Sequence, residues 1–441
     1  MKIGLIAMSG VRAYNEELTK LGLTLPGFVE RNKVIASLPS LGLLTLAALT
    51  PPRHEVSYVE IFDINQDKAT VDDFDLVAIS SYSAQIKDAY RLADECREKG
   101  IPVVLGGIHA TVLPQEAKAH ADSVVVGEAE PLWPLLIEDF EQGRLQPYYR
   151  SETHGAYDLA EAPIPAFHLL DPEKYNRLTV QTSRGCPRRC DFCASSILLT
   201  QRYKLKPIPK VIDEIRAIKE VWPRPFIEFA DDNSFANLKH SRELVRALVR
   251  EELKWFAETE ISVAQDDELL TLMRESGCKQ VLIGLESPSP EGVDGIELNS
   301  NWKHKQVDGY RRAIEKIQSF GITVNGCFIL GLDGDTPEVF ERIHDFVRDS
   351  GLYEVQITYL TPFPGTPLYA RLQAEGRIIK EGAWELCTLF DPNHVPKNMT
   401  LDELQEGALA LGMRLYSDEE TNARRRGFFK RLKASPNRHR A

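Results

Sequence analysis

The sequence predicts an α/β protein with three parts: a doubly wound N-terminal domain, a partial barrel of six βα units, and a small, mainly helical C-terminal segment. Short apolar runs alternate with segments of helical periodicity through most of the 441 residues. This alternation indicates parallel strands that are covered by helices on both faces. The βα units of the second half are longer, and six of them follow in about 180 residues, which suits a barrel of parallel strands.

The first domain is expected to span residues 1–143. Its predicted strands are Lys2–Ala7, His54–Phe62, Asp75–Ser81, Pro102–Gly107 and Asp122–Gly127. Helical patterns occur at Leu38–Thr50, Ala84–Gly100 and Pro131–Glu141. The order is that of a flavodoxin- or Rossmann-like domain, in which ligands bind at the carboxyl ends of the strands.

A linker is expected at 144–177, a stretch with four prolines and little periodicity. The barrel follows at 178–370. Its predicted strands are Leu178–Ser183, Pro225–Asp231, Lys254–Ser262, Gln280–Ser287, Thr323–Leu332 and Glu354–Thr361. Helices are predicted near Pro209–Val221, Leu238–Glu252, Asp266–Ser276, Lys303–Phe320 and Pro337–Ser350. The remainder, 371–441, is predicted to contain a helix from Leu401 to about Tyr416 and a basic tail.

Charge and composition restrict the function classes. The formal charge is 53 − 65 = −12, which argues against a nucleic-acid binder. The tail from Thr421 to Ala441 carries eight Lys/Arg residues and no acids; we expect it to be solvated and disordered, with contact to an anionic membrane surface as the alternative. No apolar run reaches the roughly 18 residues that span a bilayer. The N-terminus does not predict a secretory signal. Seven cysteines do not suggest a disulfide framework, so a reducing cytoplasm is expected.

Three cysteines are clustered immediately after the first barrel strand. Cys186, Cys190 and Cys193 have the spacing C-x3-C-x2-C. Three thiolates on one short loop can each bind one iron of a four-iron cluster, which leaves the fourth iron open to an external ligand. The loop leaves the carboxyl end of a barrel strand, where such barrels place their chemistry. The alternative is a zinc site, which needs a fourth protein ligand, and upstream His168 is the conceivable one.

With Phe192 before the last cysteine, the motif resembles that of the radical S-adenosylmethionine (SAM) superfamily. The resemblance implies a [4Fe–4S] cluster whose open iron chelates the amino and carboxylate groups of SAM. Electron transfer from the cluster would then cleave SAM to a 5′-deoxyadenosyl radical. An external electron donor, such as flavodoxin or ferredoxin, is also implied.

The resemblance assigns further SAM-binding residues to the ends of the barrel strands. Asp231 or Asp232 is expected to accept from the SAM ammonium, where the family has a Gly-Gly-Glu-like motif, although either could be a helix N-cap. Glu286 matches the position that binds the ribose hydroxyls, with a solvated strand end as the alternative. The remaining candidates are Ser262 for the SAM carboxylate and Gly326, Gly331 and Pro362 around the adenine. The alternatives are a capping serine for Ser262 and a rigid proline turn for the loop of Pro362.

The first domain resembles the cobalamin-binding domain that precedes many radical SAM barrels. The matching stretches are LPSLGLLTLAALT, VVLGGIHATVLPQEA and SVVVGEAEPLW. The resemblance implies a cobalamin over the carboxyl edge of the sheet, near Gly106, Gly107 and His109, with the glycines allowing close approach of its ring. No D-x-H-x-x-G motif is present, so we expect no histidine below the cobalt, and His109 is expected to be a hydrogen-bonding loop residue.

These features favour a cobalamin-dependent radical SAM C-methyltransferase that acts on an unactivated carbon of a small molecule, lipid or natural product. The alternatives are a radical SAM dehydratase, cyclase or oxidase whose first domain is only a scaffold, and a non-catalytic iron–sulfur or cobalamin carrier. Methylthiolation of tRNA is not expected, because there is neither an additional N-terminal cysteine triad nor a basic RNA-binding domain.

Cys327 is a candidate catalytic residue. It lies on the fifth predicted barrel strand, where a thiol that faces the cavity could donate a hydrogen atom to a substrate radical. Strand alternation could equally turn it outward. The scattered residues Cys96, Cys278 and Cys387 are interpreted as small buried apolar side chains.

Overall fold

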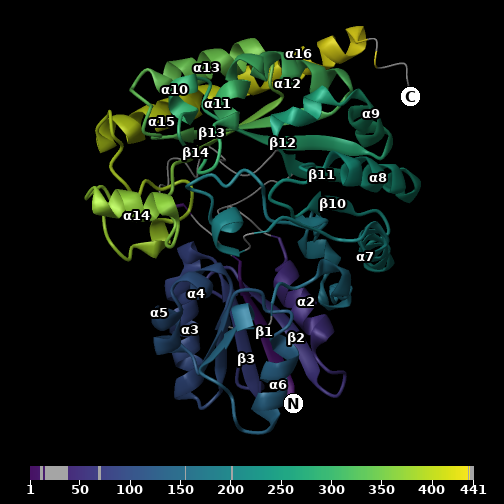
Figure 1. The fold of residues 1–441 in the computed structure, drawn as a ribbon, viewed down its shortest axis with the longest axis vertical. Helices are drawn as coiled ribbons and strands as arrows, with labels where there is room; N and C mark the ends of the chain where they lie inside the picture. The colour runs from purple at the N-terminus through teal and green to yellow at the C-terminus, as the bar shows by residue number, and fades with distance from the viewer. Residues whose placement is uncertain are drawn as a thin grey trace.

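The computed structural model describes residues 1–9, 13–14, 38–67, 71–153, 155–199, 202–435 and 437. The chain forms two parallel sheets, each with its own helices, arranged end to end along the long axis of the molecule (Figure 1). The N-terminal domain is the lower lobe in this view, and the barrel and C-terminal segment form the upper lobe.

The N-terminal sheet has six parallel strands in the order β2-β1-β3-β4-β5-β6. The strands are β1 (Lys2–Met8), β2 (Glu55–Ile61), β3 (Leu76–Ser81), β4 (Val103–Gly106), β5 (Ser123–Val126) and β6 (Tyr148–Arg150). Helices α2 (Leu41–Leu49) and α6 (Trp133–Glu141) cover one face. Helices α3 (Ile86–Glu98), α4 (Ile108–Val112) and α5 (Pro114–His120) cover the other. The doubly wound fold is therefore confirmed.

The predicted linker begins too early. Residues 148–150 form β6, which pairs in parallel with β5, so the first sheet extends to Arg150. A three-residue edge strand is too short to show a periodic pattern. From there to Asn176 the chain makes a series of short 3-10 turns that pack on both lobes, with Phe167 buried in the barrel core.

The second sheet also has six parallel strands, in the order β14-β13-β12-β11-β10-β7. They are β7 (Leu178–Val180), β10 (Phe226–Phe229), β11 (Lys254–Thr259), β12 (Cys278–Glu286), β13 (Thr323–Leu330) and β14 (Glu354–Tyr359). The outer helices are α7 (Ile208–Val221), α8 (Leu238–Leu248), α9 (Asp267–Glu275), α11 (Trp302–Gln306), α12 (Tyr310–Ser319) and α13 (Val339–Ser350). The partial barrel of six βα units is therefore confirmed.

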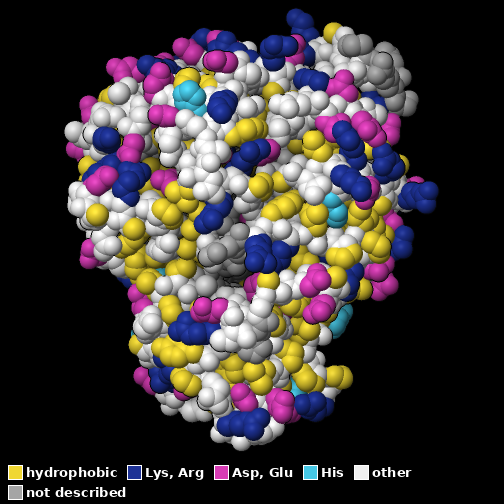
Figure 2. Space-filling model, in the orientation of Figure 1, with side chains coloured by type: hydrophobic (Ala, Val, Ile, Leu, Met, Phe, Trp, Pro, Cys, Tyr) yellow, Lys and Arg dark blue, Asp and Glu magenta, His cyan; other side chains and the backbone are white. Residues whose placement is uncertain are grey.

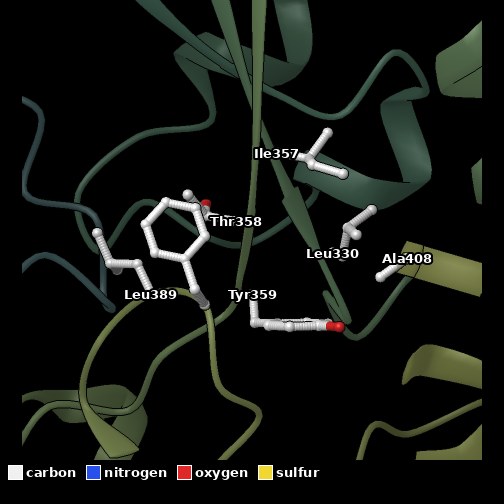
Figure 3. A pocket seen from close by; sticks show the side chains of 7 residues that line it. Leu330, Ile357, Thr358, Tyr359, Leu389 and Ala408 are labelled. Atoms are coloured by element: carbon white, nitrogen blue, oxygen red, sulfur yellow. The ribbon is translucent and has the colours of Figure 1, made fainter. Parts of the chain in front are cut away.

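The open edge of the barrel is capped by the C-terminal segment. The backbone N–H of Ile357 on edge strand β14 donates to the Tyr416 hydroxyl at 3.2 Å, and that of Tyr359 donates to the Leu389 carbonyl at 2.8 Å. Capping of this kind satisfies an edge that would otherwise pair with other chains. A cavity of about 10 Å³ lies beside β14, where Ile357 and Ala408 contribute to its lining (Figure 3). It is about the size of one water molecule and is a packing gap rather than a ligand site.

The basic tail is not disordered as far as it is described. Residues Asp418–Ala434 form α16, which follows α15 (Leu401–Leu415) and packs on the barrel. Phe428 is 3% exposed and its ring lies 5.1 Å from that of Tyr353. Arg424 donates to the Leu415 carbonyl at 2.8 Å. The expectation of a solvated tail is therefore wrong for α16, because Phe428, Arg425 and Arg431 have partners on the barrel and Arg424 has one on α15. Residues 438–441 lie outside the described residues.

Basic and acidic side chains are interspersed over the face shown in Figure 2. Within the described part of the chain, no helix is both long and apolar enough to cross a membrane.

Candidate functional site

A two-stranded antiparallel ribbon closes the loop that carries the three clustered cysteines. Strand β8 (Ser183–Arg184) pairs with β9 (Lys204–Leu205), and the cysteines lie between them. Within the loop, the backbone N–H of Cys193 donates to the carbonyl of Cys190 at 3.1 Å. The loop therefore leaves the carboxyl end of β7 on a fixed stem.

The donor set fits an iron–sulfur cluster. Cys186 Sγ accepts from the Arg188 backbone N–H at 3.5 Å and from Asn233 Nδ2 at 3.9 Å. Burial raises the pKa of the Cys186 thiol, while these two donors favour its thiolate. N–H donors to sulfur are a usual means of adjusting cluster potential. None of the three thiols is in a disulfide, and among the described side chains no three His, Cys, Asp or Glu meet in a site for a single metal ion.

The two candidate aspartates after β10 have different environments. Asp231 is 4% exposed and accepts from the backbone N–H groups of Thr182 and Ser183 at 2.7 and 2.8 Å, so it anchors the end of β7. Burial raises its pKa to about 6 despite these hydrogen bonds. Asp232 instead reaches the cysteine loop, where it accepts from the Gly185 backbone N–H at 3.0 Å and from the Ser195 hydroxyl. Of the two, Asp232 is the one that contacts the cysteine loop.

Ser262 belongs to a polar group centred on Glu260. Its hydroxyl donates to Glu260 at 2.6 Å, and Arg188 makes a bidentate ion pair with the same carboxylate at 2.6 and 2.7 Å. Burial alone would raise the pKa of Glu260, but the hydrogen bonds from Arg188, Ser262 and Asn233 and the charge of Arg188 together outweigh burial and lower the pKa. The Arg188 guanidinium also lies 3.8 Å from the centre of the Trp302 ring. The group connects the cysteine loop to β11 and α11.

Glu286 ends β12 in the left-handed backbone region, with φ of 62°. Its carboxylate is 9% exposed and pairs with the ammonium of Lys303. Burial alone would lower the pKa of Lys303, but the charge and hydrogen bond of Glu286, together with smaller contributions from Cys190 and Tyr310, outweigh burial and raise it. The predicted ribose-binding carboxylate thus has a buried cation as its partner.

The predicted adenine-binding glycines serve the fold in identifiable ways. A Cβ on Gly326 would lie 2.8 Å from Leu352 and 3.0 Å from Leu285, so its missing side chain admits packing on the outer face of β13. This is a different reason for the glycine than the predicted approach of a base. Gly331 has φ of 87°, and its N–H donates to Asp335 at 3.1 Å in the turn after β13.

Pro362 is buried just after β14. Phe192 is partly buried against the barrel core.

Cys327 faces the barrel interior. Its neighbour Gly326 turns outward toward Leu352, and alternation along β13 turns Cys327 inward. Burial raises the pKa of its thiol, and the nearby carboxylates of Glu286 and Glu258 add to the effect. Glu258 projects from β11 into the same interior, where burial and the neighbouring acids Glu228 and Asp232 raise its pKa to about 8.

Small residues lie at the carboxyl edge of the first sheet. Gly106 at the end of β4 pairs with Ser80 on β3. Gly107 adopts φ of 98°, and a Cβ on it would lie 3.1 Å from the Ser81 carbonyl oxygen and 3.2 Å from the Ser80 hydroxyl oxygen. Tyr82, directly after β3, is 61% exposed. Gly107 therefore makes room for the end of β3, which is a different reason for the glycine than the predicted approach of a corrin, and the exposed Tyr82 presents a flat ring at this edge.

His109 does not face this edge. It is fully buried, and its ring nitrogens lie 3.0 Å from the Ser83 hydroxyl and 3.3 Å from Glu116.

The carboxyl edges of the two sheets face each other. A Cβ on Gly365, in the loop after β14, would lie 3.1 Å from Val112 on α4 and 3.3 Å from Leu198 of the cysteine loop. The cysteine loop and the carboxyl edge of the first sheet therefore border one junction.

Comparison with known proteins agrees with this arrangement. The radical SAM superfamily matches residues 180–347, the B12 binding domain matches 31–136, and a domain of unknown function (DUF4070) matches 366–441. The hopanoid C-2 methylase of Rhodopseudomonas palustris is 32% identical over 361 residues, which are 79% of this chain and 67% of the methylase. The chain belongs to the radical SAM superfamily.

Two further relatives extend the likeness. The bacteriochlorophyllide d C-12(1)-methyltransferase of Chlorobaculum tepidum is 27% identical over 392 residues, 88% of this chain and 84% of that enzyme. The solved structure of the radical S-adenosylmethionine methyltransferase TsrM from Kitasatospora setae, with cobalamin and a [4Fe–4S] cluster bound, has a TM-score of 0.68 at 16% identity. The match covers 95% of this chain and 89% of the TsrM chain, and the two proteins share the fold.

As a radical SAM enzyme with a B12 binding domain, the chain takes a [4Fe–4S] cluster, SAM and cobalamin as cofactors. Several polar residues around these sites could not be recognised from the sequence. They are Arg188, Asn233, Glu258, Glu260 and Lys303. Arg188 lies inside the cysteine motif, but its partner Glu260 is 72 residues away, and no local pattern connects them.

Proposed function

We propose that this radical SAM enzyme is a cobalamin-dependent C-methyltransferase that methylates an unactivated carbon of a small or lipid-like molecule. The observation that carries the proposal is the junction itself. The cysteine loop and the carboxyl edge of the B12 binding domain meet there, with Val112 and Leu198 both against Gly365. A methyl carrier and a radical source have to meet at one substrate carbon, and this geometry supports such a meeting.

When bound, the cluster and SAM supply a hydrogen-abstracting radical, and cobalamin supplies a methyl carrier. Cys186, Cys190 and Cys193 would bind the cluster, and Asn233 and the Arg188 N–H would donate to Cys186. Asp232 would accept from the SAM ammonium, and Glu286 from the ribose hydroxyls. The corrin would lie near Gly106 and Gly107, and no histidine of this chain would bind its cobalt.

The proposed reaction replaces one substrate hydrogen with a methyl group. The radical formed from one SAM abstracts the hydrogen, and this SAM is converted to 5′-deoxyadenosine and methionine. A second SAM donates the methyl group and is converted to S-adenosylhomocysteine. Two electrons per product come from an external donor such as a flavodoxin or ferredoxin. The chain must then orient SAM, corrin and substrate in one water-poor space, and it needs no residue that moves a proton.

The test uses anaerobically purified protein loaded with iron, sulfide and cobalamin. Cell extract and SAM with a trideuterated methyl group are added with a reductant, and new products carrying three deuterium atoms are sought by mass spectrometry. We expect equal amounts of 5′-deoxyadenosine and S-adenosylhomocysteine per labelled product. Turnover without corrin and without S-adenosylhomocysteine would instead support the dehydratase, cyclase or oxidase alternative.

A further inference from the structure

Two acidic side chains of the B12 binding domain reach across the junction to the stem of the cluster loop. Glu128 and Glu130 lie in the turn after β5. Arg184 binds both, with distances of 2.8 Å to Glu128 and 2.6 Å to Glu130. Lys204 lies 2.7 Å from both carboxylate oxygens of Glu128. We call these four residues the stem clamp.

The two cations of the stem clamp occupy paired positions. Arg184 on β8 is directly opposite Lys204 on β9 in the antiparallel ribbon. Arg184 precedes Cys186 by two residues, and Lys204 lies on the other side of the loop that carries the three cysteines. A single carboxylate of the neighbouring domain, that of Glu128, therefore binds both legs of the cluster loop.

The clamp is well shielded from solvent. Its side chains are between 11% and 19% exposed. Burial alone would raise the pKa of Glu128, but hydrogen bonds from Lys204 and Arg184 outweigh it and hold the pKa below its ordinary value. Shielded, multiply hydrogen-bonded ion pairs fix geometry more firmly than exposed pairs do. Removal of Glu128 would leave two cations close together without their shared partner.

We infer that Glu128 is a positioning residue that sets the distance between the cluster loop and the B12 binding domain. The inference rests on the proposed function. Reductive cleavage of SAM requires only groups of the barrel. Methyl transfer from SAM to the corrin requires the barrel and the first domain to be aligned, and misplacement of about 1 Å can cost about a hundredfold in rate. Loss of the clamp should therefore separate the two reactions.

The experiment compares Glu128→Gln with a control, Glu385→Gln. Glu385 also makes an ion pair between the two lobes, with Lys87 of α3 at 2.5 Å, but away from the cluster stem. Three quantities are measured without substrate: iron and corrin content, 5′-deoxyadenosine release, and methylation of the reduced corrin by SAM, followed by absorbance. For Glu128→Gln we expect unchanged cofactor content, SAM cleavage within about twofold, and corrin methylation lowered roughly tenfold to a hundredfold. Glu385→Gln should leave both rates within about twofold.

A second measurement does not depend on the cofactors. Hydrogen exchange of the cofactor-free chain reports on the stem, where the Lys206 N–H donates to the Thr182 carbonyl at 2.9 Å. We expect faster exchange across 183–206 in Glu128→Gln and in Lys204→Gln, with no additional effect in the double variant. The positioning role is wrong if hydrogen exchange in Glu128→Gln is unchanged, or if its rate of corrin methylation equals that of wild type. It is also wrong if SAM cleavage and corrin methylation are lowered by the same factor. The proposed function would be wrong if wild-type protein cleaves SAM but never methylates its corrin. In that case the hydrogen-exchange result would still show whether Glu128 holds the stem.

Discussion

The ammonium of Lys303 donates to the Glu286 carboxylate and, at 3.1 Å, to the Gly284 carbonyl two residues earlier on the same strand. A buried carboxylate whose charge is balanced in this way is ready to accept hydroxyl donors on its remaining lone pairs. The pair lies near the cluster site, since Cys190 and Lys303 influence each other's pKa.

Separation of this pair should affect SAM binding and stability differently. We expect Glu286→Gln to weaken SAM binding while leaving iron content unchanged. Lys303→Met leaves a buried carboxylate without its partner and should destabilise the protein by about 3 to 5 kcal/mol. Equilibrium dialysis with SAM and urea unfolding measure the two effects. An unchanged SAM dissociation constant in Glu286→Gln would remove Glu286 from the ribose site.

The three clustered cysteines should be equivalent in cluster binding. Alanine at any of Cys186, Cys190 or Cys193 is expected to abolish SAM cleavage, with circular dichroism unchanged. Cys278→Ala is the matched control, because Cys278 is buried in the barrel core away from the loop, and it should keep iron and activity. Persistent 5′-deoxyadenosine release from the triple variant would contradict the assignment.

Cys327 separates methylation from the alternative reactions. Methyl addition to a substrate radical needs no returned hydrogen atom, so we expect Cys327→Ser to methylate at a rate within about twofold of wild type, an effect no larger than about 0.4 kcal/mol. A serine hydroxyl is a much poorer hydrogen-atom donor than a thiol. Loss of turnover in this variant would show that a hydrogen atom is returned to the substrate and would favour a cyclase or dehydratase.

Glu258 should make stability depend on pH. Its folded pKa of about 8 lies above that of an unfolded glutamate, which is about 4.3. Between these values the folded side chain retains a proton that the unfolded chain has lost, so its contribution to stability is present at low pH and decreases as pH rises to about 8. We expect unfolding midpoints in urea to fall more steeply between pH 5.5 and about 8 in wild type than in Glu258→Gln. Parallel pH profiles would show that Glu258 titrates normally.

Helix α16 offers a matched pair of phenylalanines. Phe428 is 3% exposed and packs against Tyr353, whereas Phe429 is 53% exposed. We expect Phe428→Ala to cost about 3 to 5 kcal/mol of unfolding free energy and Phe429→Ala less than about 1 kcal/mol. Truncation at Thr421 should therefore destabilise the barrel rather than merely remove a surface tail. Equal small effects of both substitutions would restore the solvated interpretation, and loss of liposome binding in Phe429→Ala alone would support a membrane contact.

Most strands of both lobes were predictable because buried parallel strands are continuous apolar runs, such as Val103–Leu105 and Val324–Leu330 with few polar interruptions. Helix α16 was not predictable, because its sequence is strongly basic and only the tertiary contacts of Arg424 and Phe428 make it a packed element. Local propensity is a weak guide when packing decides the outcome.

The cysteine motif could be recognised because its three cysteines are neighbours in the sequence. Glu128 and Arg184 are 56 residues apart, and Lys303 is 17 residues after Glu286. Each of these partners comes from a different element, so their contact depends on the relative placement of lobes and strands. Spacing within a single sequence carries no information about that placement.

The cap on β14 has a consequence for synthesis of the protein. Strand β14 is complete once residue 359 has been made, but its hydrogen-bonding partners Leu389 and Tyr416 are translated later. On the ribosome, the newly made barrel therefore exposes an unpaired strand edge until the C-terminal segment emerges. Exposed edges of this kind recruit other nascent chains, so this protein should be most prone to aggregation, and most dependent on chaperones, during the last part of its translation.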